Sequence, residues 1–258
     1  MRIGITSKKT LMLRHLGMAS LSALLVYLFY LSYSAWGVQP ALWPDWGQDH
    51  PYWRAWAHAA FVLLFVVYYN LVTAMVARRE ELVLKRLRTS QATDADILAG
   101  AAVPALAVAV VQVLIVTVAA VALLDLGVPV NPVLIVIGLL GGAAVFVLLA
   151  ALSTPFTRNV ETAQITTMPA LLVNLLFSGL TFPLDVFPDT LATAARLVPL
   201  TPVVELFLLG LEGAVASAPP VSFAETFAEA VVPVGVLLAW IVVGVYGVRR
   251  WFRWEPRN

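Results

Sequence analysis

Long apolar runs alternate with short polar connections along most of the chain. Five runs stand out, at about residues 18–36, 57–77, 98–124, 133–153 and 231–248. Each is close to the roughly 20 residues that a helix needs to cross the hydrocarbon core of a bilayer. A sixth run, from Gln164 to Phe182, contains Pro169, which buried membrane helices tolerate. The pattern predicts an all-α integral membrane protein with six transmembrane helices.

Composition supports this class. The chain is 61% hydrophobic and 12% charged, whereas roughly a quarter of the residues in a soluble domain are charged. Six spans with short connections use most of the 258 residues, so we expect residues 1–258 to form a single transmembrane domain. The chain contains no cysteine, which excludes disulfides and thiolate metal sites. Nothing in the sequence predicts a metal site or a nucleic-acid partner.

The distribution of cations predicts the orientation. With both termini in the cytoplasm, fourteen of the sixteen lysines and arginines fall on the inner side, and only Arg54 and Arg196 fall outside. A five-span arrangement would send the C-terminal arginines to the other face. Because cations accumulate in cytoplasmic loops, the count favours six spans with both termini cytoplasmic. The outer tryptophans are typical of an interfacial belt, with a ligand cage as the alternative: Trp43, Trp46, Trp53 and Trp56.

Two connections are more than simple turns. Residues 1–17 alternate apolar side chains with lysine and arginine, which suits an amphipathic helix on the inner leaflet, although an ordinary basic flank fits equally well. The run that follows is too long for a signal peptide and lacks a cleavage site, so we expect a signal anchor. The outer segment 184–230 is too apolar to be solvated and is divided by prolines. It predicts short helices that either are re-entrant and shielded from lipid by protein or lie at the interface.

A densely charged segment separates the second and third spans. Positions 78–88 contain five cations, and Glu81 and Lys85 are spaced for an i, i+4 pair on a short helix. Thr93 and Asp96 form a variant of the capping box that would start the third span. The charges could merely be the cytoplasmic signal. That signal needs only cations, however, and the interleaved Glu80, Glu81 and leucines favour a surface for docking a partner.

Polar side chains within the spans fall on one-sided stripes. One stripe follows the fifth span and the other the second: Gln164, Thr167, Asn174 and Ser178, and Tyr69, Asn70 and Thr73. They either line a path for an apolar substrate or join helices by hydrogen bonds, which is a common use of such residues in membranes. In the fourth span, Gly138 and Gly142 form a small-xxx-small pair that we expect to serve packing within the chain rather than a dimer.

Other functional classes lack their signatures. The histidines are scattered at positions 15, 50 and 58, and neither His-Glu-x-x-His nor Gly-x-Ser-x-Gly occurs, which disfavours an intramembrane enzyme. The spans contain essentially no ionisable residues, which disfavours proton or sodium coupling. No Gly-x-x-x-x-Gly-Lys occurs, so we do not expect the chain to bind ATP through a P-loop. Any energy source must lie in a partner.

Several motifs, taken in order, resemble the permeases of type-2 ABC exporters, the class with the ABCG-like membrane fold that includes bacterial drug- and antibiotic-resistance permeases. The matching segments are Ala-Arg-Arg-Glu-Glu at 77–81, Leu-Lys-Arg-Leu-Arg-Thr at 84–89, Ile-Leu-Ala-Gly at 97–100, Met-Pro at 168–169, Ser-Gly-Leu-Thr-Phe-Pro-Leu at 178–184, Phe-Pro at 187–188 and Val-Pro-Leu-Thr-Pro at 198–202. The resemblance covers nearly the whole chain.

The resemblance implies an ATP-driven exporter in a bacterial cytoplasmic membrane. Two permeases, here expected as a homodimer, would form the translocation path, and two separate ATPase subunits would bind ATP and Mg²⁺, with no cofactor on this chain. The charged segment would be the coupling helix, and residues 1–17 the connecting helix. The implied ATPase contacts are Arg79, Glu80, Glu81, Lys85, Arg86 and Arg88. The substrate class would be a hydrophobic or amphipathic drug, antibiotic or lipid. A membrane scaffold or a channel not coupled to ATP is the alternative.

Overall fold

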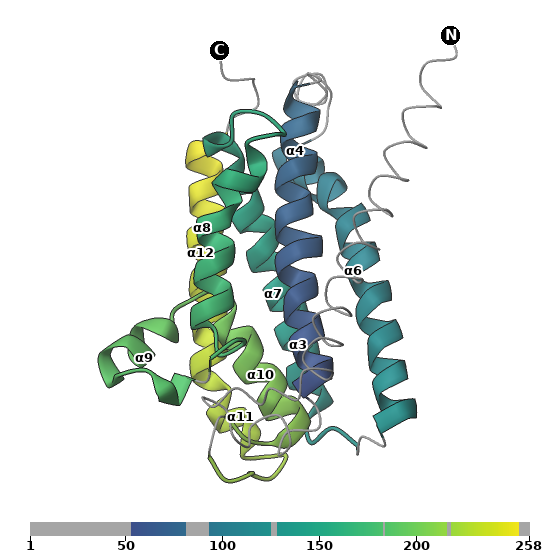
Figure 1. Ribbon diagram of the computed structural model, residues 1–258, viewed down its shortest axis with the longest axis vertical. Helices are drawn as coiled ribbons and strands as arrows, with labels where there is room; N and C mark the ends of the chain where they lie inside the picture. The colour runs from purple at the N-terminus through teal and green to yellow at the C-terminus, as the bar shows by residue number, and fades with distance from the viewer. Residues whose placement is uncertain (1–52, 81–92, 125–127, 183, 216–217, 253–258) are drawn as a thin grey trace, which may run out of the picture.

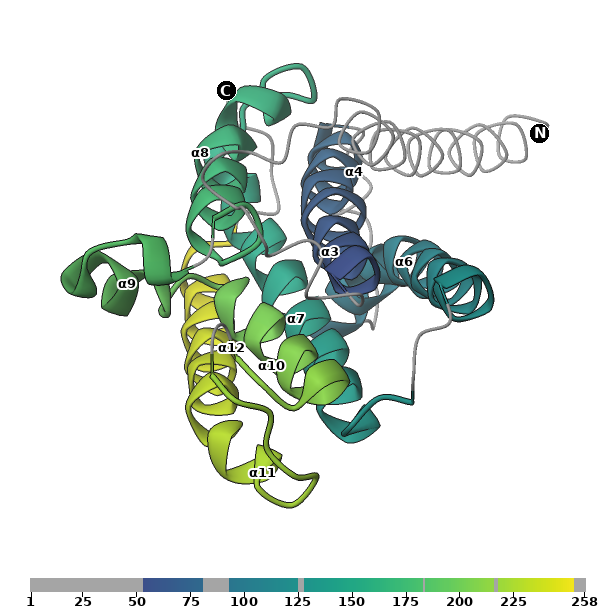
Figure 2. The ribbon, with the colours of Figure 1, turned by 60° about the horizontal axis from the view of Figure 1, so that its bottom comes forward.

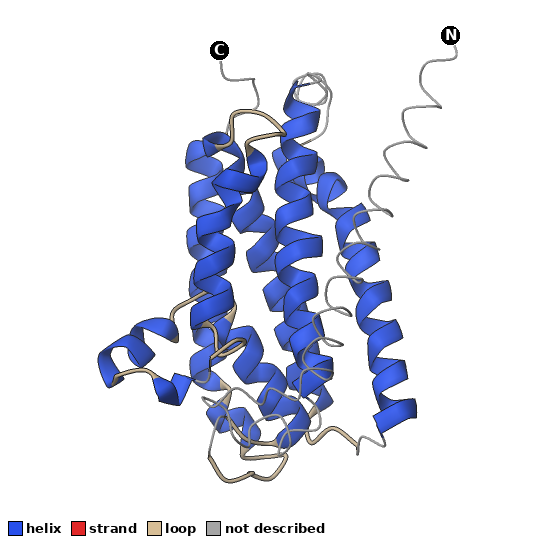
Figure 3. Cartoon of the chain, viewed as in Figure 1, coloured by secondary structure: helices blue, strands red, loops and turns tan. Residues whose placement is uncertain are grey.

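The computed structural model describes residues 53–80, 93–124, 128–182, 184–215 and 218–252, and every regular element in them is a helix (Figure 3). Four helical stretches are long and apolar enough to cross a membrane: Ala57–Glu80, Asp96–Ile115, Pro132–Phe156 and Thr226–Trp251. The predicted all-helical membrane fold is therefore confirmed. The predicted first span, the amphipathic helix at 1–17, Trp43, Trp46 and the charged segment 81–92 lie outside the described residues.

One long helix forms the centre of the bundle. It comprises α3 (Trp53–Phe61), a π-helix η1 (Val62–Tyr69) and α4 (Asn70–Glu80). The wider turn is seen at Asn70, whose N–H donates to the carbonyl of Phe65. Nearly all of η1 is buried, because neighbouring helices pack against it on several sides (Figure 1). Over its whole length this helix contacts α6, α7, α8 and α10.

Two long helices pack on this centre. The first, α6 (Asp94–Leu124), begins with the predicted capping box: the Thr93 hydroxyl and N–H both donate to the Asp96 carboxylate, and Asp96 N–H donates to Thr93 Oγ1. The second, α7 (Pro132–Ser153), is capped by Asn131, which accepts from the N–H of Val133 at 3.1 Å. The capping prediction for the third span is confirmed, and the cap on α7 adds a second well-defined helix start.

The helix α8 (Ala163–Phe177) is shorter than the apolar run that predicted it. With 15 residues it falls below the roughly 20 needed to cross a bilayer as a single straight helix. The chain leaves the helix at Ser178, and Gly179 has φ +81°, a left-handed conformation that glycine adopts without a steric penalty. The residues 178–182, which the sequence suggested as the end of the span, are irregular for this reason.

Short helices fill the connection between α8 and the last long helix α12 (Val231–Trp251). In order they are η3 (Leu184–Val186), α9 (Asp189–Ala195), α10 (Thr201–Glu212) and α11 (Thr226–Glu229). The last is preceded by Ser222, whose N–H and hydroxyl donate to the Glu225 carboxylate and lower the pKa of Glu225. Short helices were expected here, and α10 is shielded by protein as predicted, because its residues from Thr201 to Gly210 are buried.

Packing of α10 against α7 depends on glycine. A Cβ on Gly138 would meet Leu206 and Phe207, and a Cβ on Gly142 would come within 2.9 Å of Val203 Cγ2. The predicted small-xxx-small pair therefore packs within the chain, as expected. Because Val203 lies at the level of Gly142 and Gly210 lies against Asn131, α10 runs from the middle of α7 back to its first turn, like a re-entrant helix.

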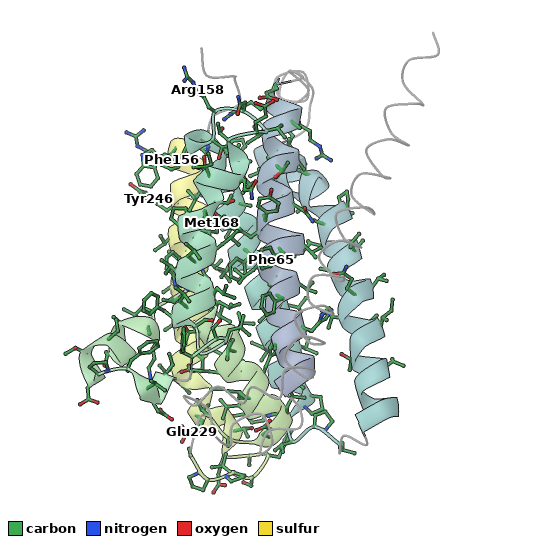
Figure 4. All side chains as sticks on the ribbon, viewed as in Figure 1. Phe65, Phe156, Arg158, Met168, Glu229 and Tyr246 are labelled. Carbon is green, nitrogen blue, oxygen red and sulfur yellow. The ribbon has the colours of Figure 1, made fainter. Side chains whose placement is uncertain are left out.

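Five of the seven arginines in the described residues gather at one end of the bundle. The end of α4, the turn between α7 and α8 and the last turn of α12 lie together in Figure 1 and bear Arg78, Arg79, Arg158, Arg249 and Arg250. Figure 4 shows Arg158 at this end and Glu229 at the opposite end. Arg196 follows α9, on the side of the short helices. The residues that the charge count assigned to one side of the membrane thus share one end of the protein.

Candidate functional site

Of the two candidate coupling residues that the structure describes, Arg79 is the buried one. It lies in the last turn of α4 and is only 1% exposed, and it is the largest fully buried side chain in the described residues. Its Nη1 donates to the carbonyl of Thr154 at 2.9 Å. Its Nη2 donates to the carbonyls of Thr157 at 2.5 Å and Arg158 at 3.2 Å. The guanidinium is therefore held by the turn that follows α7.

These carbonyls lie at and just after the end of α7. The helix passes into a short 3-10 turn, η2 (Thr154–Phe156), whose Thr154 carbonyl also accepts from the N–H of Thr157 at 3.2 Å, and Thr157 and Arg158 follow this turn. The hydroxyls of Thr154 and Thr157 donate backward to Ala150 and Ser153 at 2.9 and 3.0 Å, which fixes the turn. A guanidinium suits this site because it offers several donors in one plane, and a cation is favourable at the C-terminal end of a helix.

The other candidate coupling residues are placed differently. Glu80 is exposed at the end of α4, directly before the charged segment. Glu81, Lys85, Arg86 and Arg88 lie outside the described residues. Of the six residues for which the resemblance implies ATPase contacts, the structure therefore describes two, one exposed and one buried. Arg79 faces the protein's own backbone rather than the surface.

A second link joins the same two helices closer to the middle of the bundle. The Tyr68 hydroxyl lies 3.0 Å from Ser153 Oγ, and Ser153 in turn donates to the carbonyl of Leu149 at 2.9 Å. Tyr68 is buried and its ring contacts Phe146. Together with Arg79, it ties the central helix to the end of α7 at two levels.

Most of the polar stripe on α8 faces the interior. Thr167, Asn174 and Ser178 are buried, whereas Gln164 is exposed. Thr167 donates to the carbonyl of Ala163 at 2.8 Å. Asn174 donates to the carbonyl of Ala170 at 2.8 Å and accepts from the N–H of Leu200 at 3.0 Å, just before α10. In this arrangement Asn174 joins α8 to the start of α10.

The stripe on the central helix is less enclosed. Tyr69 and Thr73 are half-buried, and the Thr73 hydroxyl donates to the carbonyl of Tyr69 at 3.1 Å. Asn70 is buried. The neighbouring α8 exposes a mostly apolar face: Ile165, Met168, Leu172 and Val173. Figure 4 shows Met168 and Phe65 on these adjacent helices, so a partly apolar surface with a few polar groups runs along both.

Some structural contacts of the site gave no sequence signal. The carbonyls that hold Arg79 belong to the backbone and have no residue signature. Glu205, in the middle of the otherwise apolar α10, is 9% exposed. Its signal in the sequence is a single carboxylate within an apolar run.

Comparison with known families identifies the chain. A model of the ABC-2 family transporter protein matches residues 58–248 of the 258. The chain belongs to the ABC-2 transporter family. No significant match exists to a curated protein or to a solved structure.

The matched region contains Arg79, the turn after α7, α8 and α10. The predicted resemblance to an ABC-2 permease is therefore confirmed. An ABC-2 permease is the multi-pass membrane component of an ABC transporter, is not itself the ATPase, and associates with ABC ATPase subunits.

Proposed function

We propose that this ABC-2 permease is the membrane subunit of an ATP-driven exporter. In the proposed complex, two copies of the chain form the translocation path and two separate ATPase subunits bind ATP and Mg²⁺. The ATPases dock on Glu80 and the charged segment 81–92. The observation that carries the proposal is the place of this segment: it directly follows α4, the helix at the centre of the bundle, at the end where the arginines gather.

The orientation follows from the same observation. We propose six spans, with both termini and the charged segment in the cytoplasm, in a bacterial cytoplasmic membrane. The shared end of Arg78, Arg158, Arg249 and Arg250 supports this orientation, because cations accumulate on the cytoplasmic side. The short helices α9 to α11 are then on the outer side.

The proposed substrate is a hydrophobic or amphipathic compound such as a drug, an antibiotic or a lipid. Its path runs along the surface shared by the central helix and α8, where Tyr69, Thr73 and Gln164 retain exposed area beside the apolar face of α8. We assign Asn70, Thr167, Asn174 and Ser178 to this path as residues of its supporting wall, since they are buried. The few polar groups suit a substrate that is largely apolar.

Native mass spectrometry of the tagged chain, purified in mild detergent from its own host, tests this function. We expect two permeases with two ATP-binding subunits. Reproducible recovery of the permease without an ATPase would contradict the proposal and favour a scaffold or an uncoupled channel.

Charge reversal tests the docking surface in the same preparation. Arg86→Glu with Arg88→Glu should release the ATPase subunits, because the proposed contact surface loses two cations. Arg249→Glu is the matched control, since Arg249 is exposed in the last turn of α12 and lies outside the charged segment. Equal retention of the ATPase in both variants would exclude 81–92 as the docking surface.

A further inference from the structure

Arg79 connects the helix that leads into the charged segment with the turn that leads into α8. It is separated from that segment by Glu80 alone. We propose that Arg79 is a positioning residue that transmits the movement of the charged segment to the turn between α7 and α8 during the ATPase cycle. This inference rests on the proposed function, in which the ATPases dock on 81–92, and adds how their movement reaches α8.

The bonds to Arg79 make the connection stiff. A buried guanidinium cannot leave its acceptors without losing charge-assisted hydrogen bonds in a place that water does not reach. Its acceptors are the backbone carbonyls of Thr154, Thr157 and Arg158, so the whole turn, and not one flexible side chain, is held. Displacement of the end of α4 therefore displaces the turn with it.

The turn itself is joined rigidly to the start of α8. Asn159 and Thr162 bind each other twice, through Asn159 N–H to Thr162 Oγ1 at 3.1 Å and Thr162 N–H to Asn159 Oδ1 at 2.9 Å. The Thr162 carbonyl then accepts from the Thr166 hydroxyl and N–H within the first turn of α8. Arg79 is thus connected to α8 by its hydrogen bonds to the turn, by the peptide bond from Arg158 to Asn159, and by the hydrogen bonds of Asn159 and Thr162.

Two further contacts join the end of α7 to the central helix. Thr154 Oγ1 lies 3.8 Å from Met75 Sδ at the start of the turn, and Tyr68 binds Ser153 just before it. Arg79 also donates to the carbonyls of Thr157 and Arg158, which lie closer along the chain to α8. A residue that only stabilised the bundle would not need to lie between the docking segment and the one turn that starts α8. The location of Arg79, more than its burial, points to a role in transmitting movement to the turn.

Distance measurements in the complete complex test the proposal. Because the chain has no cysteine, Ala77→Cys with Tyr246→Cys and Glu161→Cys with Tyr246→Cys each give one spin-labelled pair. Each pair is co-expressed with an excess of the cysteine-free chain and the ATPase, so that a complex carries one labelled copy. Double electron–electron resonance then compares the nucleotide-free complex with the complex trapped by ATP, Mg²⁺ and vanadate.

With Arg79 present, we expect both distances to change on trapping. With Arg79→Gln the Ala77 distance should still change, and the change at Glu161 should be lost. Arg79→Lys, which keeps the charge and three donors, should restore it in part. Arg249→Gln is the control and should leave both changes intact. If Arg79→Gln does not assemble, Arg79→Met is used, because it keeps the apolar stem without burying an unpaired polar group.

Two other outcomes decide against the proposal in different ways. An unaltered change at Glu161 in the Arg79→Gln or Arg79→Met complex would show that α8 is moved by another route, and would leave the proposed function intact. An Ala77 distance that does not respond to nucleotide in the unmutated complex would contradict ATP coupling itself. A purely structural role for Arg79 would lower the yield of the complex without separating the two distances.

Discussion

The helices α9 and α10 lie a few residues apart in the same connection, between α8 and α12, and have opposite surroundings. Of α9 only Ala195 is buried, and Figures 1 and 2 show α9 projecting from the side of the bundle. In α10 every residue from Thr201 to Gly210 is buried. Both segments contain apolar side chains. Hydrophobicity alone therefore does not decide which short helix joins the core of a membrane protein.

The difference lies in what each helix can approach. Gly138 and Gly142 of α7, and Gly210 of α10, let two backbones come close, and close approach is the main source of packing energy where lipid is as apolar as the side chains. No glycine of the described residues plays this role for α9, which is attached through Trp240 Nε1 to the carbonyl of Leu197 at 2.8 Å. Substitutions in and around the two helices test this contrast between the buried α10 and the exposed α9.

Phe207→Ala should have the largest effect. The ring is 1% exposed and lies over Gly138, so its loss leaves a cavity between α10 and α7. We expect the free energy of unfolding to fall by about 3 kcal/mol. This is the lower end of the range for buried aromatic residues, because lipid is as apolar as the protein interior and mainly packing contacts are lost. Titration with SDS, followed by helical circular dichroism, measures it. An unchanged midpoint would contradict a core role for α10.

Gly210→Ala should have the second-largest effect on stability, because it overpacks a close contact instead of leaving a cavity. The added Cβ would lie 2.6 Å from Ile135 Cγ1 and 2.9 Å from the backbone oxygen of Asn131. Because a backbone atom cannot turn away as a side chain can, we expect a loss of about 2 kcal/mol in the same titration. Gly235→Ala is the control, since nothing lies within 4 Å of its Cβ position. Equal effects of the two substitutions would mean that close approach is not what holds α10.

Asn131→Ala should have a smaller effect. Asn131 caps α7 and its Nδ2 donates to Thr226 Oγ1 at 2.9 Å, in a place where neither residue is exposed. We expect a loss of about 1 kcal/mol, the usual size of a lost helix cap. Asn131→Asp keeps the capping oxygen but loses the donor to Thr226, so a comparison of the two unfolding midpoints separates the cap from the link to α11. A midpoint equal to that of the unmutated chain would mean that neither contact contributes.

Leu191→Ala should have the smallest effect, within about 0.5 kcal/mol, because Leu191 is 39% exposed on α9. Leu206→Ala is the same substitution at a fully buried position of α10 and should cost about 2 kcal/mol. Thermal melting in detergent, followed by size exclusion, compares the pair. If the two variants melt together, α9 and α10 contribute alike and the contrast drawn above is wrong.

Sequence patterns predicted the parts of this structure that depend on periodicity and on local chemistry. The apolar runs located α4, α6, α7 and α12, the spacing of Thr93 and Asp96 predicted a helix start, and the apolar outer segment predicted shielding. Packing between segments that are distant in the sequence could not be predicted from such patterns. The stripe through Thr167 and Asn174 identified a shared face, but a helical wheel cannot say whether that face meets a substrate or the N–H of Leu200.

Arg79 shows the same limit more sharply. In the sequence it is one of five cations in a charged stretch, and nothing distinguishes it from Arg86 or Arg88. Its burial depends on backbone carbonyls at and just after the end of α7, which lie some 75 residues further along the chain. The π-helix is likewise without a residue signature, because its run of valine, leucine, phenylalanine and tyrosine is equally compatible with an α-helix.

The π-helix η1 affects how the protein tolerates the deletion of a residue. Its turns hold more residues than those of an α-helix, so one residue can be removed between 62 and 69 and the hydrogen bonds can shift from i, i+5 to i, i+4. The helices on both sides would keep the faces that they now present, Arg79 included. The same deletion in the middle of α7 would rotate everything beyond it by about 100°. A one-residue deletion is therefore tolerated better in η1 than in a regular helix such as α7, even though η1 is buried.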